Sequence, residues 1–211
     1  MNFNKNLWDT TEAKEMGDFE TLELGGHEIV IMDAREYTSE ISGNTSLKVS
    51  VDIAGKDKQA GYFKKQYDNN IMADRKWPSG AVKYLSLKDE QIAYLKGFVT
   101  AVENSNNGFK FDINGSWEQL KGKKLAGQFG LEEYKDNEGK VKTATKLIQF
   151  RSLDKLKEIK IPKVKLIDET FVEYEDYKNR SVTTANEVFG SDAVIITDEM
   201  LPFWFWKKQQ L

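Results

Sequence analysis

Apolar and polar side chains alternate along several stretches of the chain, and this alternation predicts β-strands. The clearest case is residues 47–53, where Leu, Val, Val and Ile alternate with Lys, Ser and Asp, as in a strand with one buried face. The β-rich residues 27–37 predict a strand before it, and residues 61–67 (GYFKKQY) predict a third strand after it. Turn-forming residues at 42–44 and 55–58 separate these strands. The first part of the chain is therefore predicted to be a three-stranded meander.

The pattern changes to helical spacing after residue 70. Ser86 is expected to cap a helix that runs from Leu87 and ends before Asn106, because apolar residues recur every three to four positions between them. Residues 125–134 and 141–151 then predict two strands, joined by a polar loop that contains a glycine.

Three strands, a helix and a two-stranded hairpin follow one another in the order that is typical of an OB-fold. This fold is a five-stranded Greek-key barrel with a helix between the third and fourth strands. We therefore predict a mainly β chain with an OB-fold domain over residues 17–152 and an N-terminal arm over residues 1–16. Residues 153–211 are predicted to be a basic linker followed by a largely irregular, acidic C-terminal tail.

Composition removes several classes of function. The 211 residues include no Cys, which excludes disulfides, thiolate zinc sites and cysteine nucleophiles. The single histidine, His27, leaves little room for a histidine-ligated metal or a Ser-His-Asp triad. No apolar run approaches the roughly 18 residues that a membrane helix needs, and the polar start does not resemble a signal peptide. We expect a soluble intracellular protein that is not an enzyme.

The net charge of −3 conceals a strong separation of charge along the chain. Residues 1–55 carry 4 basic and 11 acidic side chains, residues 56–165 carry 23 and 14, and residues 166–203 carry 2 and 9. A basic middle between acidic ends suggests a body that binds a polyanion and a tail that could compete for it. Ordinary surface charge on a mildly acidic protein is the alternative.

Aromatic and cationic residues are interleaved in the basic middle, as in proteins that bind single strands. Such proteins stack bases on aromatic rings and neutralise phosphates with lysine or arginine. We expect the nucleic acid to contact Tyr62, Lys64, Lys65, Arg75, Lys76, Trp77, Phe109, Lys124, Lys146 and Arg151. Other aromatic residues are expected mostly in the core, namely Phe63, Tyr67, Phe111, Trp117, Phe129 and Phe150.

Motifs for catalysis are weak by comparison. The chain has no phosphate-binding loop, and Gly25-Gly26 lacks the third glycine of a dinucleotide fingerprint. Glu138-Gly139-Lys140 and Glu158-Ile159-Lys160 match a Glu-x-Lys fragment that some metal-dependent nucleases contain, a pattern common by chance in a chain this charged. His27 is expected at the start of a strand rather than as a metal ligand.

Taken together, several short motifs resemble the single-stranded DNA-binding proteins encoded by phages of Gram-positive bacteria. The similarity covers about residues 17–168. The order and spacing of the motifs are more specific than any single motif. The motifs are Gly17-Asp18-Phe19-Glu20, Ser42-Gly43-Asn44, Val51-Asp52-Ile53-Ala54, Gly61-Tyr62-Phe63, Leu95-Lys96-Gly97-Phe98, Leu120-Lys121-Gly122-Lys123-Lys124, Phe150-Arg151-Ser152 and Ile161-Pro162. The resemblance implies an OB-fold, no cofactor, and a role in phage DNA replication or recombination in the cytoplasm of the infected host.

The end of the chain resembles a second feature of bacterial single-stranded DNA-binding proteins, an acidic tip that recruits replication and repair enzymes. The residues that carry this similarity are Asp198, Glu199, Leu201, Pro202 and Phe203. In those proteins the chain ends at the phenylalanine, whereas here residues 204–211 follow. The segment could instead pack on the protein itself or on a second copy.

The sequence thus favours a protein that binds single-stranded DNA without sequence specificity and recruits phage or host replication and recombination proteins through its tail. The alternative is a phage scaffold that binds only protein. A nuclease is a third hypothesis, which predicts metal-dependent cleavage. The oligomeric state stays open.

Overall fold

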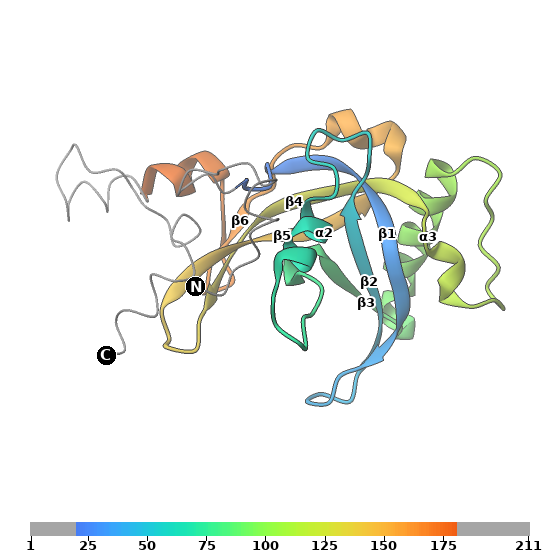
Figure 1. The fold of residues 1–211 in the computed structure, drawn as a ribbon, viewed down its shortest axis with the longest axis horizontal. Helices are drawn as coiled ribbons and strands as arrows, with labels where there is room; N and C mark the ends of the chain where they lie inside the picture. The colour runs from blue at the N-terminus through green and yellow to red at the C-terminus, as the bar shows by residue number, and fades with distance from the viewer. Residues whose placement is uncertain (1–19, 181–211) are drawn as a thin grey trace, which may run out of the picture. The chain divides into compact units, whose positions relative to one another are not determined.

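The computed structural model describes residues 20–180 and is built on an open, mixed β-sheet of seven strands (Figure 1). The five longer strands are β1 (Gly25–Thr38), β2 (Thr45–Ile53), β3 (Val82–Ser86), β4 (Lys124–Lys135) and β5 (Val141–Arg151). Two short strands follow, β6 (Val164–Lys165) and β7 (Phe171–Val172). The main helices are α2 (Tyr62–Asn69) and α3 (Ile92–Ser105), with 3-10 turns η1 (Ser79–Ala81), η2 (Asp89–Gln91), η3 (Trp117–Leu120) and η4 (Leu153–Glu158). The described chain is mainly β, as the sequence predicts.

β1 is central in the sheet, because it pairs with β2 along one edge and with β4 along the other. The hydrogen-bonded order is β3-β2-β1-β4-β6-β7, and β5 also pairs with β4. All these pairings are antiparallel except that of β4 with β6. The register of the β1–β2 pair shifts between Ile31 and Asp33. Such an irregularity bends a strand, and β1 curves along its length in Figure 1.

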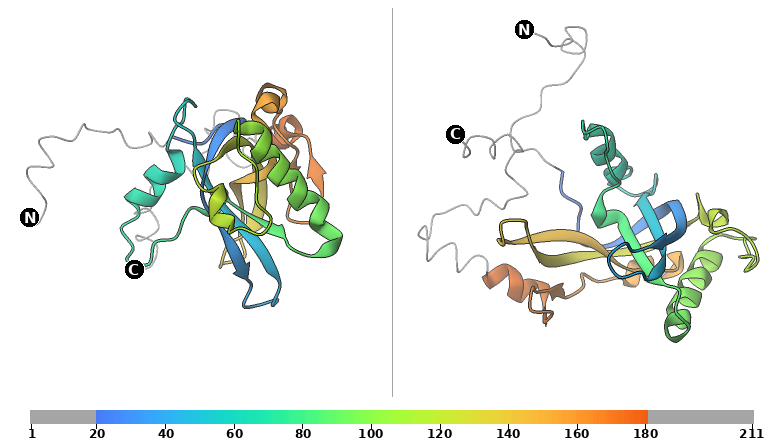
Figure 2. Two further views of the ribbon diagram at one scale, coloured as in Figure 1. Left: turned by 90° about the vertical axis from the view of Figure 1, so that its right-hand side faces the viewer. Right: turned by 90° about the horizontal axis from the view of Figure 1, so that it is seen from below.

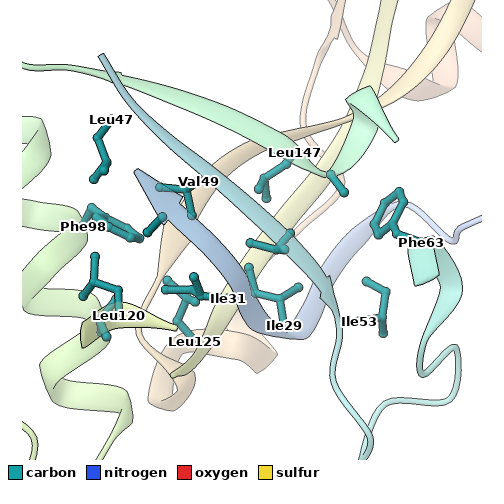
Figure 3. Packing of buried hydrophobic residues seen from close by; sticks show 14 of the residues in the cluster. Ile29, Ile31, Leu47, Val49, Ile53, Phe63, Phe98, Leu120, Leu125 and Leu147 are labelled. Atoms are coloured by element: carbon teal, nitrogen blue, oxygen red, sulfur yellow. The ribbon is translucent and has the colours of Figure 1, made fainter. Parts of the chain in front are cut away.

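The core lies inside the curved sheet and is closed by one helix at each end. The alternation in β2 buries Leu47, Val49 and Val51 completely. In Figure 3, Phe63 of α2 lies at one end of the labelled core residues and Phe98 of α3 lies at the other. The two helices accordingly lie on different sides of the strands in Figure 2. The predicted strands β1, β2, β4 and β5 are confirmed within a few residues of the expected bounds. The predicted helix is confirmed as α3, but it begins at Ile92 after η2, so Gln91 and not Ser86 occupies its N-cap position.

The prediction of a third strand over residues 61–67 is wrong, because this segment forms helix α2. Gly61 precedes the helix in the left-handed region (φ 72°), which glycine adopts without steric cost. The helix N-terminus is then capped from another element: Asp52 Oδ1 of β2 accepts hydrogen bonds from the backbone N–H groups of Phe63 (3.0 Å) and Lys64 (3.4 Å). Tyr62, Lys64 and Gln66 therefore do not share one face of a strand. The third strand is β3.

The folded unit continues past residue 152, where the sequence predicts a linker. Residues Leu22–Asn179 form one compact unit, and residues after β5 pack on the sheet. The side chain of Gln128 donates a hydrogen bond to the carbonyl of Lys160 (2.8 Å), and β6 pairs with β4 in parallel. The predicted arm, residues 1–16, and residues 181–211 of the predicted tail lie outside the described residues.

Candidate nucleic-acid interface

Two exposed tyrosines and a half-buried lysine form a group on the outer face of β1, β2 and β3. Strand register places Lys48 of β2 between Arg35 of β1 and Tyr84 of β3. The Tyr37 and Tyr84 rings lie 5.5 Å apart, and Lys48 Nζ lies 5.8 Å from the Tyr37 ring centre. Tyr37 is 41% exposed and Tyr84 is 49% exposed. We call Tyr37, Lys48 and Tyr84 the tyrosine platform.

The platform arises from the alternation of the strands. Leu47 and Val49 point into the core, so Lys48 between them points outward. Leu47 pairs with Leu85, and Lys48 pairs with Tyr84, which places Tyr84 on the same outer face as Lys48. Exposed rings beside cations are the combination that single-strand binders use, since the rings stack on bases and the cations attract phosphates.

A second aromatic group lies where the chain passes from α2 to β3. The Tyr67 and Trp77 rings lie 5.4 Å apart, and the Arg75 guanidinium lies 4.6 Å from the Tyr67 ring centre. The indole N–H of Trp77 donates a hydrogen bond to the carbonyl of Val51 (2.9 Å). We call Tyr67, Arg75 and Trp77 the α2 cluster. Its tryptophan is attached to β2, the strand that also carries Lys48.

Six of the ten predicted contact residues belong to α2 or to the loop after it. Tyr62 is partly buried and packs edge-on against Phe63. Lys64 forms an ion pair with Asp68 (2.6 Å), and Lys65 and Lys76 have exposed side chains. The other two residues of the six belong to the α2 cluster, Arg75 and Trp77.

The remaining four predicted residues lie elsewhere on the unit. Phe109 is partly buried with Lys123 Nζ 4.3 Å from its ring centre. Lys124 forms an ion pair with Glu28 (2.7 Å). Lys146 donates a hydrogen bond to the Ser79 hydroxyl (2.9 Å), which attaches β5 to η1. Arg151 is exposed at the end of β5.

The tyrosine platform is not among the nucleic-acid contacts expected from the sequence. Tyr37 and Tyr84 are far apart in the chain, and only the register of β1, β2 and β3 brings their rings together. The alternation in β2 was enough to place Lys48 on the polar face. Tyr84 could not be placed on that face because the third strand was expected at residues 61–67.

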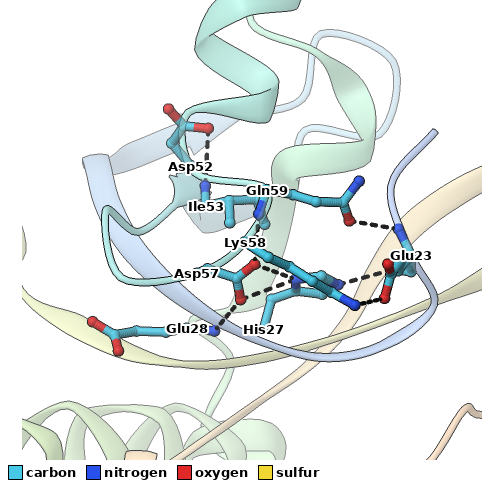
Figure 4. A network of polar contacts seen from close by, with 8 residues as sticks. All are labelled: Glu23, His27, Glu28, Asp52, Ile53, Asp57, Lys58 and Gln59. Atoms are coloured by element: carbon cyan, nitrogen blue, oxygen red, sulfur yellow. Dashed lines mark hydrogen bonds and ion pairs between the residues drawn. The ribbon is translucent and has the colours of Figure 1, made fainter. Parts of the chain in front are cut away.

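A polar network around the buried His27 holds two segments of this unit together. His27 is 3% exposed, with Nδ1 3.1 Å from Asp57 Oδ2 and Nε2 2.9 Å from the carbonyl oxygen of Glu23 (Figure 4). Asp57 also accepts a hydrogen bond from the backbone N–H of Gln59 (3.0 Å). The network attaches the loop after β2 to the start of β1, so His27 has a structural role at the strand start.

The described residues offer no metal centre. No group of three or more His, Asp or Glu side chains within residues 20–180 could hold a metal ion. In the first Glu-x-Lys fragment, Glu138 and Lys140 form an exposed ion pair with each other (2.9 Å) in the turn between β4 and β5. No helix in the described part of the chain has both the length and the apolar character needed to cross a bilayer.

The predicted partner-binding residues, Asp198, Glu199, Leu201, Pro202 and Phe203, lie outside the described residues. Searches with the sequence found no matching family model and no curated protein of significant similarity.

Proposed function

We propose that this protein binds single-stranded DNA without sequence preference through the outer face of β1, β2 and β3. The observation that carries the proposal is the tyrosine platform, in which two exposed rings in contact lie beside a lysine on one sheet face. Each base stacked on such a ring contributes about 1–3 kcal/mol to binding. Stacking does not depend on base identity, which fits binding without sequence preference.

An OB-type arrangement is part of this proposal. Its support is the pairing of β1 with both β2 and β4, the β4–β5 hairpin, and the position of α3 between β3 and β4. β5 also approaches the start of β3, because a Cβ atom added to Gly80 would lie 2.5 Å from the Thr145 carbonyl oxygen. The OB-fold binds oligonucleotides on the face that includes its second and third strands, which is the face of the platform.

The resemblance to phage single-stranded DNA-binding proteins supplies the biological setting of the proposal. We place the protein in phage DNA replication or recombination, in the host cytoplasm, where it acts by binding rather than by catalysis. Its acidic C-terminal residues, Asp198 to Phe203, would recruit replication or recombination proteins.

The experiment is a fluorescence-anisotropy titration of a labelled oligo-dT strand, with the matching duplex as a control, at two salt concentrations. We expect binding to the single strand, with log K falling against log salt by about 0.7 per neutralised phosphate. Tyr84→Ala should weaken binding roughly 5- to 150-fold, the equivalent of about 1–3 kcal/mol. Tyr134→Ala, which removes an exposed tyrosine of the distant β4–β5 hairpin, is the matched control and should bind as wild type.

Failure of the wild-type protein to bind oligo-dT at low salt would overturn the proposal. The protein-interaction scaffold would then be the better hypothesis. Equal affinity of Tyr84→Ala and wild type would instead show that the nucleic acid lies on another face.

A further inference from the structure

A groove of about 790 Å³ lies between α3, β3 and β5. Residues of α3, of the edge strands β3 and β5, and of η4 line this groove. The Phe98 and Phe150 rings, 4.7 Å apart, lie among its lining residues. Gly97 also lines the groove, and a Cβ atom added there would meet no atom within 4 Å. The space above Gly97, between the other α3 residues that line the groove, is therefore open.

The charged side chains that line this groove are all cationic. Lys83, Arg151 and Lys155 are among the lining residues, and no described residue that lines it is acidic. None of the three forms an ion pair with another described residue at the distances of a salt bridge. Burial lowers the pKa of Lys83, although the charge of Glu132 acts in the opposite direction.

The groove is continuous with the tyrosine platform. Tyr84 belongs to the platform and also lines the groove. Tyr94 of α3 also lines the groove and is 77% exposed. A chain that stacks on Tyr84 could therefore reach a second exposed ring and the two exposed cations Arg151 and Lys155 along the same surface.

We infer that the bound single strand continues from the tyrosine platform into this groove, where Arg151 and Lys155 contact phosphates and Tyr94 stacks on a base. This inference rests on the proposed function and adds the course of the strand. It assigns the protein a binding site longer than the sheet face alone. Single-strand sites on OB-folds range from about 4 to 16 nucleotides, so a two-part site fits within the known range.

An acidic peptide is the other polyanion that the cations could attract. Two observations favour the nucleic acid: the continuity of the groove with the platform through Tyr84, and the exposure of Tyr94, whose ring can stack on a base. Binding of an acidic peptide in the groove is therefore an alternative result that the test distinguishes.

The test compares oligo-dT strands of about 6 and about 16 nucleotides, lengths within the usual range of site sizes. Three variants of the full chain are titrated by anisotropy beside wild type. The double variant Arg151→Gln/Lys155→Gln removes two groove cations, and Gly97→Leu fills the open centre. Lys96→Gln is the matched control, since it removes an exposed α3 charge outside the groove lining.

We expect wild type and Lys96→Gln to bind the longer strand much more tightly than the shorter one. The double variant should lose most of this gain in affinity, and the slope of log K against log salt should fall by about 1.4, or 0.7 per cation. Gly97→Leu should lose the same gain, and its unfolding temperature should be no lower than that of wild type, because leucine favours a helix more than glycine does. The Gly97→Leu variant also tests the inference if the double variant does not fold.

Three results separate the hypotheses. If no strand binds to wild type, the proposed function itself fails. If wild type binds but Gly97→Leu keeps the full advantage of the longer strand, the groove is not on the path and the inference is overturned. If Gly97→Leu leaves DNA binding unchanged but abolishes binding of a labelled polyglutamate peptide, the groove is a peptide site, which also overturns it.

Discussion

Replacing Asp52 by alanine or by asparagine separates two properties of one buried carboxylate. The residue is 4% exposed, and its Oδ1 atom accepts hydrogen bonds from the backbone N–H groups of Ile53 (2.9 Å), Phe63 (3.0 Å) and Lys64 (3.4 Å). The last two groups belong to the first turn of α2, whose N–H donors have no partner within the helix. Alanine removes the acceptor, whereas asparagine retains an oxygen acceptor and removes the charge.

The two variants should therefore differ in stability. Loss of a helix cap costs about 0.5–2 kcal/mol, and a buried donor without a partner costs about 1–3 kcal/mol. Because the same N–H groups enter both figures, we expect Asp52→Ala to lower the free energy of unfolding by about 2 kcal/mol. This corresponds to a fall in Tm of about 4–8 °C for a unit of this size. Asp52→Asn should stay within about 1 kcal/mol of wild type.

The pH dependence of the asparagine variant tests the role of the charge. Burial raises the pKa of Asp52 above its ordinary value of 3.8 and outweighs the hydrogen bonds that lower it. The folded state therefore holds the proton more tightly than the unfolded state does. The contribution of this group to stability is fully present below the unfolded pKa and is lost as pH rises through the folded pKa. The free energy of unfolding of Asp52→Asn, taken relative to that of wild type, should be highest near pH 7. This difference in stability should shrink as the pH falls toward about 4.

Urea denaturation followed by far-UV circular dichroism, at about pH 7 and about pH 4.5, measures both effects. The three proteins are compared at each pH, so that the titration of other carboxylates cancels. Equal loss of stability in Asp52→Asn and Asp52→Ala would refute the idea that an oxygen acceptor is what α2 requires. If the difference in unfolding free energy between Asp52→Asn and wild type does not change with pH, the claim that burial of the Asp52 charge is unfavourable is refuted.

Further predictions concern the same unit, each checked by urea denaturation. Gly80→Ala should lower the free energy of unfolding by about 1–3 kcal/mol, because its Cβ atom would lie 2.5 Å from the carbonyl oxygen of Thr145; an unchanged midpoint would show that β5 can move away from η1. His27→Ala should lower it by about 2–3 kcal/mol, because Asp57 and the Glu23 carbonyl lose their ring partner. Glu138→Gln, in an exposed hairpin ion pair, should leave the midpoint unchanged.

The parts of the fold that could be predicted from sequence are those with a local pattern of sufficient length. Residues 47–53 alternate strictly, and this alone places one face in the core. Helix α2 has no comparable signal, because its cap comes from Asp52, ten positions before the helix begins. β3 has five residues that are mostly half-buried, which leaves no contrast between its faces. The two-residue strands β6 and β7 depend on pairing with distant residues.

The candidate site was predictable only in its chemical character. Interleaved cations and rings in the basic middle indicated a polyanion, and Arg75 and Trp77 do meet in the α2 cluster through Tyr67. The contact between Tyr37 and Tyr84 requires the register of three strands, which the sequence does not state. The groove beside α3 likewise exists only once β3, α3 and β5 are assembled.

The two aromatic groups of the interface are both positioned by β2, which links stability to binding. Lys48 of the tyrosine platform is part of β2, and the α2 cluster is attached to the same strand through the bond from Trp77 to Val51. Asp52, which follows Val51 in β2, accepts the hydrogen bond from the backbone N–H of Phe63 that caps α2. Loss of this cap should therefore displace the α2 cluster while leaving the tyrosine platform in place. The Asp52→Ala variant should accordingly bind oligo-dT more weakly than wild type at temperatures where the variant remains folded. Asp52→Asn should retain both the helix and the affinity, and a variant that kept full affinity without the cap would show that the platform alone carries the contact.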